Sequence, residues 1–538
     1  MLKKNLSIIL VLKATILLSL SAQNLPLVYD VENSVTNIPK PRVLSLSELP
    51  VIQSLPDPFR WADGRGRISY YSDWGYRRVE IGAHIQNYEI GEKPPRPDTI
   101  TADYSNGVLT VNVTVNGKTL TLTSSVVLPS GAGPFPAVIG INSSSGSLPT
   151  TIFSSRNIAR ITFSHNQLTV YGNPKNTDPY YRLYPHLNVD NTGQYSAWAW
   201  GVSRIIDGLE LVKDKLPIDL KHLAVTGCSY AGKLALFAGA FDERIALTIA
   251  QESGGGGATS WRFSHTETVS VEKIDNTDYN WFMNSMKQFS GDNVYKLPID
   301  HHELMAMCAP RALLVTANTD YTWLSNQSCY VASIATKKVY DALNISDRFG
   351  FVIDGGHSHC QVPNSQLPVI EAFVEKFLLG NNSVNTNVAV TPYNTNLSPW
   401  ITWTIPTLSN GNSYFGRTSL ISPDNNAKGL NKNVTFKWNK VLDAAKYFIQ
   451  IALDPIFNNI VINDSTTTDT LKTYQLADGK KYYWRVRVKS TNNLSGPFSD
   501  IWMFTTFIDL PSAPSLVSAR QYSNRQGSYT FTWKSVKN

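Results

Sequence analysis

The sequence predicts an α/β fold, a three-layer sandwich with helices on both faces of a mostly parallel sheet, followed by a C-terminal all-β immunoglobulin-like sandwich. Two observations predict this architecture. Short, continuous apolar runs alternate with helical segments in the earlier part of the chain, which is typical of strands buried on both faces. Nearer the C-terminus, short segments alternate apolar and polar residues one by one, and turn residues separate these segments. Because 538 residues exceed what one core accommodates, two to four domains are expected.

The first residues predict a secretory signal peptide over residues 1–22. Two lysines stand near the start, an apolar run follows from Leu6 to Leu20, and Ser21-Ala22 supplies small residues for cleavage. The apolar run is too short and too interrupted for a comfortable membrane span. We therefore expect a secreted protein, extracellular or periplasmic, with no membrane span, in a compartment where disulfides persist.

Residues 23–395 are expected to form the α/β domain. A helix capped by Ser72 or Asp73 comes first, and a hairpin that turns at Asn116-Gly117 follows. A helix over residues 196–212 then leads to a strand that stops near Ser229. Further buried strands are expected at Phe135–Ile141, Ile245–Ala250, Arg311–Thr316 and Phe349–Ile353.

The tail is expected to form β-sandwich material. Strongly alternating segments and turn residues over residues 412–508 predict a module that resembles a fibronectin type III domain. Val434-Thr-Phe-Lys-Trp438 recurs as Tyr529-Thr-Phe-Thr-Trp533, at the spacing of one domain. Residues 509–538 are therefore expected to be the start of a second, truncated module. Such modules would serve as spacers or as attachment to other extracellular modules.

Charge and composition narrow the possible partners. The formal net charge of +7 is mild for a chain of this length, and no basic run argues for nucleic acid. Thirteen Trp and 25 Tyr favour surfaces that stack on flat rings such as sugars, although aromatic residues are also common in cores and sheets. A polysaccharide is therefore a more natural partner than nucleic acid.

The chemistry is expected to centre on Ser229. Apolar residues typical of a strand stop at Gly227, and residues typical of a helix begin after Ser229, which stands at the turn. This is the arrangement of the nucleophile elbow of α/β-hydrolases, whose sharp turn needs small residues two before and two after the serine. Gly227 and Ala231 occupy those places, whereas Gly232 comes one residue later than a glycine usually does. The alternative is a serine that merely caps a helix.

A serine nucleophile needs a base and a group that orients the base. The last buried strand is followed by Asp354-Gly-Gly-His-Ser-His-Cys360, in which His357 and His359 compete for the role of base. Two candidate acids follow buried strands between the serine and the histidines, Glu252 after one strand and Asp320 after the next. Asp320 stands where common members of the fold place the acid. The residues alone leave both choices open.

Four cysteines allow three pairings if all are bonded. Cys228 directly precedes the candidate nucleophile and Cys360 directly follows a candidate base, so a bridge between these two is favoured. A bridge between Cys308 and Cys329 is less favoured, and four free thiols are the alternative.

Several separate motifs follow one another between about Leu55 and Leu379. They are Leu55-Pro-Asp-Pro-Phe59, Asp73-Trp74 with Arg77-Arg78 and Glu80, Gly227-Cys-Ser229 with Gly232-Lys233, Phe241-Asp-Glu-Arg-Ile-Ala246, Gln251-Glu-Ser-Gly254, Trp261-Arg262, Asp320 to Cys329, and His359-Cys360. In type and order these motifs resemble the glucuronoyl esterases, the fifteenth family of carbohydrate esterases. Their agreement makes the resemblance far more specific than an elbow alone.

The resemblance implies roles that the bare residues leave open. It implies that Ser229 is the nucleophile, Glu252 the acid and His359 the base, with Asp320 as the rival or a helper. His357 is then interpreted as a turn residue. The resemblance also provides precedent for the bridge between the cysteines that adjoin Ser229 and His359.

The resemblance further implies that Lys233 and Trp323 hold the glucuronate, and Asp278 matches a further sugar-binding carboxylate more loosely. The family usually has arginine directly after the nucleophile, where it helps the oxyanion, but this chain has Tyr230. The Tyr230 backbone N–H remains a donor, while the fixed positive charge is lost. Ser260 replaces another cysteine that the family often carries, so Cys329 lacks its usual partner.

The resulting expectation is a secreted serine esterase that cleaves the ester between 4-O-methyl-glucuronate of glucuronoxylan and lignin alcohols. No metal and no organic cofactor are expected. One alternative is an acetyl xylan esterase of the same fold. Another is a catalytically inactive protein that uses the cleft and its aromatic residues to bind polysaccharide.

Overall fold

The computed structural model describes residues 25–36, 38, 40–411, 417–441, 444–491, 495–507, 515–521 and 529–534. The expected signal peptide lies outside these residues. The chain divides into two compact units, each taken by itself below. The first unit comprises Met1–Thr36, Pro50–Pro58 and Ser69–Gly411, and the second comprises Asn37–Leu49, Phe59–Ile68 and Asn412–Asn538.

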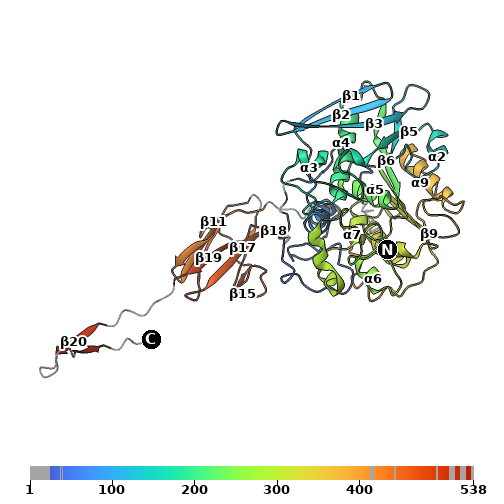
Figure 1. The fold of residues 1–538 in the computed structure, drawn as a ribbon. Coiled ribbons are helices and arrows are strands. Elements are labelled where there is room, and N and C mark those ends of the chain that lie inside the picture. The colour runs from blue at the N-terminus through green and yellow to red at the C-terminus, as the bar shows by residue number, and fades with distance from the viewer. Residues whose placement is uncertain are drawn as a thin grey trace, which may run out of the picture. The chain divides into compact units, whose positions relative to one another are not determined.

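A ten-stranded sheet forms the centre of the first unit (Figure 1). Its order is β1-β2-β3-β5-β4-β6-β7-β8-β9-β10; the strands from β5 to β10 run parallel, and β1 to β3 form an antiparallel extension. The bounds are β1 Thr99–Ser105, β2 Val108–Val115, β3 Lys118–Val127, β4 Phe135–Ile141, β5 Ala159–Phe163, β6 Ile218–Cys228, β7 Leu247–Gln251, β8 Ala312–Asn318, β9 Phe349–Asp354 and β10 Ala389–Val390.

Burial follows the pattern expected of these strands. Every residue of β7 and β8 is buried, as expected of central strands covered on both faces. In β3, by contrast, buried and exposed residues alternate, because only one face of the extension is covered. The mostly parallel α/β sheet and the hairpin at Asn116-Gly117 are confirmed. The sequence analysis missed β1, β5 and β10.

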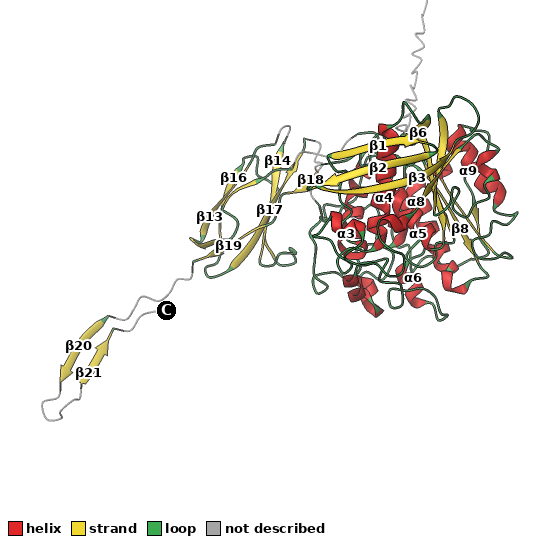
Figure 2. Cartoon of the chain, turned by 45° about the horizontal axis from the view of Figure 1, so that its top comes forward, coloured by secondary structure: helices red, strands yellow, loops and turns green. Residues whose placement is uncertain are grey.

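Helices pack against both faces of this sheet (Figure 2). Helices α4, α5 and α8 contact strands on one side, and α9 packs across β4, β6, β7 and β8. The α-helices are α1 Asp73–Ile85, α2 Thr151–Ser154, α3 Pro179–Leu183, α4 Gln194–Leu211, α5 Tyr230–Phe241, α6 Trp261–Thr266, α7 His301–Ala306, α8 Asn326–Ala342 and α9 Leu367–Leu379. Short 3₁₀ or π turns are η1 Gln86–Ile90, η2 His165–Gln167, η3 Asn284–Phe289, η4 Gly291–Lys296, η5 Thr322–Leu324 and η6 Ser346–Arg348.

An apolar core joins α9 to the sheet. Phe373 and Phe377 of α9 are buried against Val138 of β4 and Ile249 of β7, and Phe153 of α2 belongs to the same cluster. Burying such side chains contributes about 1.5–3 kcal/mol each. Because the strands from β5 to β9 run parallel, the loops at their carboxyl ends lie at one edge of the sheet, where ligand sites of such sheets are found.

A buried ion cluster ties the start of the described chain to α4. The Glu32 carboxylate accepts hydrogen bonds from Lys93 and Arg204, and Arg204 also contacts Asp207 at 2.6 Å. Burial by itself would raise the pKa of Glu32, but the Lys93 and Arg204 cations lower it to about 2. The folded state therefore holds this carboxylate ionised.

The segment after the last strand of the sheet also belongs to the first unit. Leu397, Trp400 and Trp403 pack against a buried cluster that includes Leu55 and Phe263. The Trp403 indole donates a hydrogen bond to the Leu55 carbonyl at 3.2 Å. These contacts carry the first unit to Gly411.

The second unit is rich in β-strands. One sheet has the order β11-β13-β16, another has β12-β19-β17-β14-β15 with β18 paired to β17, and β20 pairs with β21. The bounds are β11 Leu420–Ser422, β12 Ala427–Leu430, β13 Asn433–Trp438, β14 Lys446–Ala452, β15 Ile460–Asp464, β16 Leu471–Gln475, β17 Lys481–Lys489, β18 Ser495–Phe498, β19 Trp502–Thr506, β20 Leu516–Gln521 and β21 Tyr529–Trp533. Phe436 of β13 and Trp484 of β17 share one core, so the first two sheets face each other.

A cation on β17 is stacked between two aromatic rings. The Arg485 guanidinium lies between the rings of Phe457 and Phe498, 4.0 and 3.9 Å from their centroids. The Asp63 carboxylate accepts a hydrogen bond from the Phe498 backbone at 3.4 Å, and its charge opposes the lowering of the Arg485 pKa, which burial brings to about 10. These contacts explain why residues 59–68 belong to the second unit.

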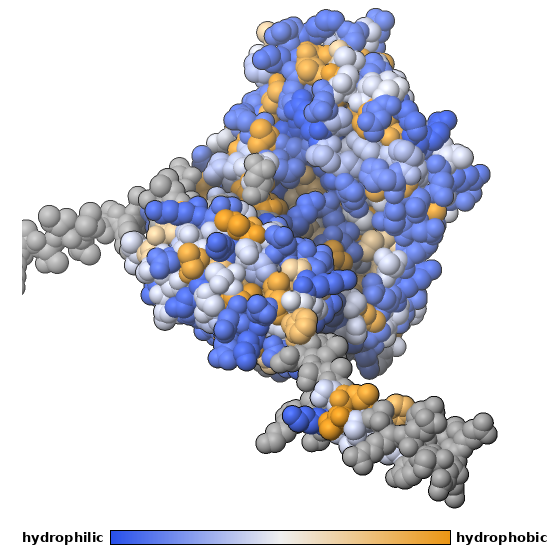
Figure 3. Space-filling model, turned by 90° about the vertical axis from the view of Figure 1, so that its left-hand side faces the viewer, coloured by the Kyte–Doolittle hydropathy of each residue, from blue (hydrophilic) through white to orange (hydrophobic). Residues whose placement is uncertain are grey.

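On the face that Figure 3 shows, hydrophilic residues predominate among the described residues, and apolar ones occur in small groups. Within the described ranges, no helix is both long enough and apolar enough to span a bilayer.

Replacing Glu32 by glutamine is expected to destabilise the first unit by about 3 kcal/mol at neutral pH, since it removes the carboxylate charge from the buried Lys93 and leaves Arg204 with Asp207. The folded-state pKa is lowered, so the wild-type advantage is full above about pH 4.5 and disappears as the pH falls toward 2. Denaturant unfolding of Glu32→Gln and wild type at several pH values measures this. Glu371→Gln, which breaks a partly exposed ion pair with Arg156, is the control and is expected to cost less than about 1 kcal/mol. Equal stability of Glu32→Gln and wild type at neutral pH would contradict the account.

Candidate active site

Ser229 stands at a strained turn between β6 and α5. Its φ of 58° and ψ of −128° lie in a region that residues with a side chain rarely adopt, at a cost of about 1–3 kcal/mol. Two backbone hydrogen bonds hold it there: the Ser229 N–H donates to the Gln251 carbonyl at 3.0 Å, and the Lys233 N–H donates to the Ser229 carbonyl at 3.0 Å. A side chain at such a turn projects beyond the carboxyl end of its strand.

Two glycines permit the close approach of strand and helix. A Cβ atom on Gly227 would lie 2.4 Å from the Ala231 carbonyl oxygen, and one on Gly232 would lie 2.4 Å from the Gln251 carbonyl oxygen. Both distances are too short for real atoms, so neither position tolerates a side chain without movement of the backbone. Gly232 is therefore as necessary for this turn as the small residues two positions before and two positions after the serine.

A short hydrogen bond links His359 to Glu252. The Nδ1 of His359 lies 2.6 Å from Glu252 Oε2, and the Cys360 N–H donates to the same oxygen at 3.1 Å. Glu252 is fully buried and follows β7 with a positive φ of 44°, while its own N–H donates to the Thr316 carbonyl at 2.7 Å. With Nδ1 engaged by the carboxylate, Nε2 is the nitrogen left for proton transfer.

Asp320, the other candidate acid, serves a different contact. Its side chain is exposed at the end of β8, where it accepts the Gly356 N–H at 2.7 Å. No hydrogen bond or ion pair joins Asp320 to His359 in the described chain. Of the two acids, the structure therefore brings Glu252 to the imidazole and leaves Asp320 as a support of the loop that carries the histidines.

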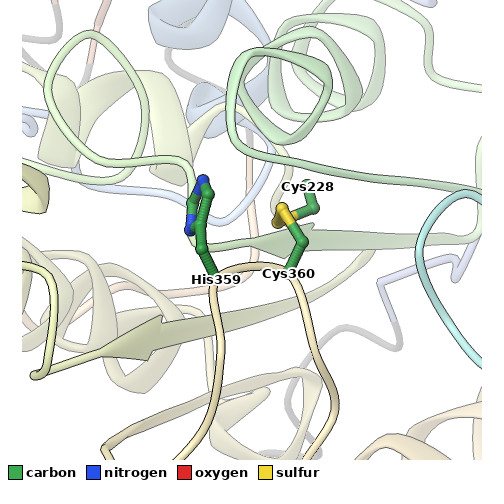
Figure 4. A group of neighbouring side chains, drawn as sticks. All are labelled: Cys228, His359 and Cys360. Atoms are coloured by element: carbon green, nitrogen blue, oxygen red, sulfur yellow. A yellow bond between two sulfur atoms is a disulfide. The ribbon is translucent and has the colours of Figure 1, made fainter.

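A disulfide joins the two halves of the site. Cys228 and Cys360 are bonded, with Cα atoms 5.7 Å apart and a sequence separation of 132, whereas Cys308 and Cys329 are free and buried. Figure 4 shows the His359 ring beside this bridge. Both sulfurs also lie within 4.8 Å of a His359 nitrogen, but a disulfide offers no thiolate to a metal ion.

Tyr230 follows the serine and joins three segments through its phenol. Asn142, just after β4, donates to the Tyr230 hydroxyl at 2.8 Å, and His165 Nε2 lies 3.3 Å from the same oxygen. Burial lowers the pKa of His165 to about 4, so that ring is neutral near pH 7. The Tyr171 ring packs on Tyr230 with centroids 4.4 Å apart. The phenol thus ties the start of α5 to the loop after β4.

Lys233 lies one turn further along α5 and is nearly fully buried. Its Nζ donates to Glu272 Oε2 at 2.9 Å and lies 4.7 Å from the centre of the Trp281 ring. The sequence analysis did not identify Glu272, and no motif marks it. A buried lysine must find an anion or a ring, but the burial of Lys233 is itself known only from the structure.

Aromatic rings flank His359. The Tyr321 and Trp323 ring centroids lie 5.3 and 5.8 Å from that of His359, and Trp323 remains 48 % exposed. Asp278 is half-buried, accepts the Asn280 N–H at 2.9 Å, and helps to raise the pKa of Tyr171, although burial of that ring is the larger cause. Trp323 therefore borders the histidine, and Asp278 lies toward Tyr171.

His357 does not behave as a simple turn residue. Its side chain is only 3 % exposed, and its Nδ1 lies 3.7 Å from Glu252 Oε1. The sequence analysis interpreted it as a turn residue because the family resemblance assigned the role of base to His359, and nothing in the sequence indicated that its side chain is buried.

The chain is similar to known esterases of one family. A family model for fungal glucuronyl esterase matches residues 111–344. A 4-O-methyl-glucuronoyl methylesterase from Podospora anserina is 38% identical over 372 residues, which are 67% of this chain and 76% of that protein. The glucuronoyl esterase catalytic domain from Hypocrea jecorina superposes with a TM-score of 0.63 at 38% identity and covers 67% of this chain and 98% of that domain.

A third similar structure contains a ligand. It is a serine-to-alanine mutant of the glucuronoyl esterase from Sporotrichum thermophile, in complex with methyl 4-O-methyl-β-D-glucopyranuronate. It is 36% identical, has a TM-score of 0.62, and covers 67% of this chain and 97% of that one.

Removing the bridge by Cys228→Ala with Cys360→Ala is expected to cost up to about 5 kcal/mol, because the bridge closes a loop of 132 residues in the unfolded chain. Since Cys360 adjoins His359, the hydrolytic kcat is expected to fall more than KM changes. Denaturant unfolding and steady-state kinetics measure the two effects. Cys329→Ala, which removes a free buried thiol, is the control and is expected to keep kcat. A double variant with wild-type stability and kcat would show that the bridge does not organise the site.

Proposed function

The chain belongs to the glucuronoyl esterase family, and from that premise we propose that it hydrolyses the ester between 4-O-methyl-glucuronate of glucuronoxylan and lignin alcohols. The observation that carries this proposal is the 2.6 Å hydrogen bond between His359 and Glu252, beside the strained turn at Ser229. A nucleophile, a base and an acid on neighbouring strand ends are what acyl transfer requires.

Ser229 is the proposed nucleophile. Its hydroxyl attacks the uronoyl carbonyl carbon while His359 Nε2 takes the hydroxyl proton. The tetrahedral intermediate then collapses, the ester bond to the alcohol breaks, and His359 returns the proton to the leaving alcohol oxygen. Water repeats the sequence on the acyl-enzyme and releases the free uronic acid. Throughout, Glu252 orients the imidazole and stabilises its positive charge.

The backbone N–H of Tyr230 is the proposed donor to the oxyanion. The first N–H groups of a helix have no partner within the helix and carry its positive dipole end. The Tyr230 phenol holds this turn against Asn142, on the loop that supplies the second donor in hydrolases of this fold. A neutral phenol gives the intermediate less electrostatic stabilisation than the arginine that the family usually carries here. Turnover below that of arginine-bearing relatives is therefore expected.

Lys233 and Trp323 are the proposed uronate-binding residues, with Asp278 as a further sugar contact. Lys233 is held by Glu272 and by the Trp281 ring, so little side-chain freedom is lost when it binds a hydroxyl. The exposed face of Trp323 beside His359 gives a sugar ring an apolar surface close to the reacting bond.

The remaining parts of the chain support this function outside the site. We propose that residues 1–22 direct secretion and that residues 23–395 form the esterase domain. Residues 412–508 are proposed to form an immunoglobulin-like sandwich of the fibronectin type III kind, and residues 509–538 the start of a second one. Their role would be spacing or attachment to other extracellular modules.

Ser229→Ala is expected to lower the hydrolysis of benzyl glucuronate by at least about 10⁴-fold, since the nucleophile is lost. Steady-state kinetics of the full chain on this ester and on acetylated xylan measure activity and preference together. The exposed Ser130→Ala is the control and should keep wild-type rates. Equal background hydrolysis in wild type and Ser229→Ala would mean that the chain binds polysaccharide without cleaving it. Preferential release of acetate from acetylated xylan would indicate an acetyl esterase.

A further inference from the structure

The second carboxylate oxygen of Glu252 is unused by the contacts described above. Oε2 accepts hydrogen bonds from His359 and Cys360, whereas Oε1 is buried and has no hydrogen-bond partner among the described residues. A buried charged oxygen without a hydrogen-bond donor is energetically costly. We therefore expect Oε1 to accept a hydrogen bond when the site is active.

The His357 imidazole lies close to this oxygen. Its Nδ1 lies 3.7 Å from Glu252 Oε1, and its Nε2 lies 3.6 Å from Asp354 Oδ1. The ring therefore stands between the carboxylate that follows β7 and the carboxylate that ends β9. Because the His357 side chain is buried, it is not a mobile surface side chain.

The surroundings hold His357 in this place. The Asn318 side-chain amide donates to the His357 carbonyl at 2.9 Å and lies 3.1 Å from Nδ1. On the other side, Gln366 donates to Asp354 at 2.6 Å and lies 3.5 Å from His357 Nε2. Groups from β8, β9 and the start of α9 thus fix the ring, which a turn residue without a function would not need.

We propose that His357 is a positioning residue, whose Nδ1–H donates to Glu252 Oε1 and so fixes the carboxylate that orients His359. The inference rests on the proposed esterase function. The present 3.7 Å exceeds the usual N–H···O distance, and the Ser358 carbonyl, 3.2 Å from Nδ1, accepts the Nδ1–H in this state. The bond to Glu252 forms when the ring turns away from this carbonyl and from the Asn318 amide nitrogen, which also donates and lies 3.1 Å from Nδ1. Hydrogen bonds of catalytic groups are often long without substrate and shorten in the complex.

The proposal predicts a direction for the pH dependence. The titratable groups around His357 are Glu252, Asp354, the neighbouring His359 and, through the Gly356 N–H, Asp320. A donor on Oε1 stabilises the ionised Glu252 and lowers the proton affinity of the Glu252–His359 pair. Loss of this donor raises that proton affinity. As the pH is lowered, activity is then lost at a higher pH than in wild type. Mere loosening of the site would weaken the contact of Glu252 with His359 and move the acid limb to lower pH.

His357→Leu removes the donor, and His357→Gln retains an N–H at similar reach. On benzyl glucuronate, His357→Leu is expected to lower kcat about tenfold with little change in KM, and to shift the acid limb of kcat upward. His357→Gln is expected to recover most of kcat and the wild-type limb. His222→Leu, which removes a histidine paired with Asp219 away from the site, is the control and should change neither.

A measurement that does not need turnover separates this inference from the proposed function. NMR titration of the His359 imidazole in the full chain is expected to give a higher pKa in His357→Leu than in wild type, His357→Gln or His222→Leu. An unchanged or lowered His359 pKa, or an unchanged kcat, would overturn the role of His357. If the wild type shows no Ser229-dependent hydrolysis, the proposed esterase function is overturned instead. The NMR result would still decide whether His357 positions Glu252.

Discussion

The hydrogen bond between Glu252 and His359 is the interaction on which the proposed chemistry depends. It joins the loop after β7 to the loop after β9, across the intervening strand β8, and it places a fully buried carboxylate against an imidazole. A carboxylate so deep in the sheet is tolerated because the Cys360 N–H also donates to it. An acid on β8 would leave more room for solvent, as the exposed Asp320 illustrates. Placing the acid on β7 therefore makes its charge more effective in low dielectric.

The parts around this bond resist displacement in complementary ways. The disulfide holds the loop of His359 against the end of β6, and the close packing of Gly227 and Gly232 holds the serine turn in its strained conformation. The Tyr230 phenol adds a polar clamp to the loop after β4 where an arginine would supply charge. These contacts hold the loops around the proposed site in fixed positions, which is what catalysis by preorganised groups requires.

The fold could be predicted from the sequence where the signal is local. Continuous apolar runs identified the central strands, and Asn116-Gly117 identified the hairpin, because period and turn chemistry are properties of short segments. From the sequence, the candidate catalytic residues could be narrowed to a few side chains that follow buried strands, since parallel strands bring their carboxyl ends to one edge of the sheet. The choice between Glu252 and Asp320 could not be made from the residues themselves, because it depends on the reach of one loop over another strand. Glu272 and the burial of His357 gave no local signal, since both arise from packing between distant segments.

The most direct test of the account compares Glu252→Gln with Asp320→Asn on benzyl glucuronate. Both changes replace a carboxylate by an amide of the same shape, so the comparison isolates the charge that orients His359. The account predicts that kcat falls by about 10⁴-fold in Glu252→Gln, as expected when the acid of a triad is neutralised, and by less than about tenfold in Asp320→Asn. A greater loss in Asp320→Asn than in Glu252→Gln would contradict it.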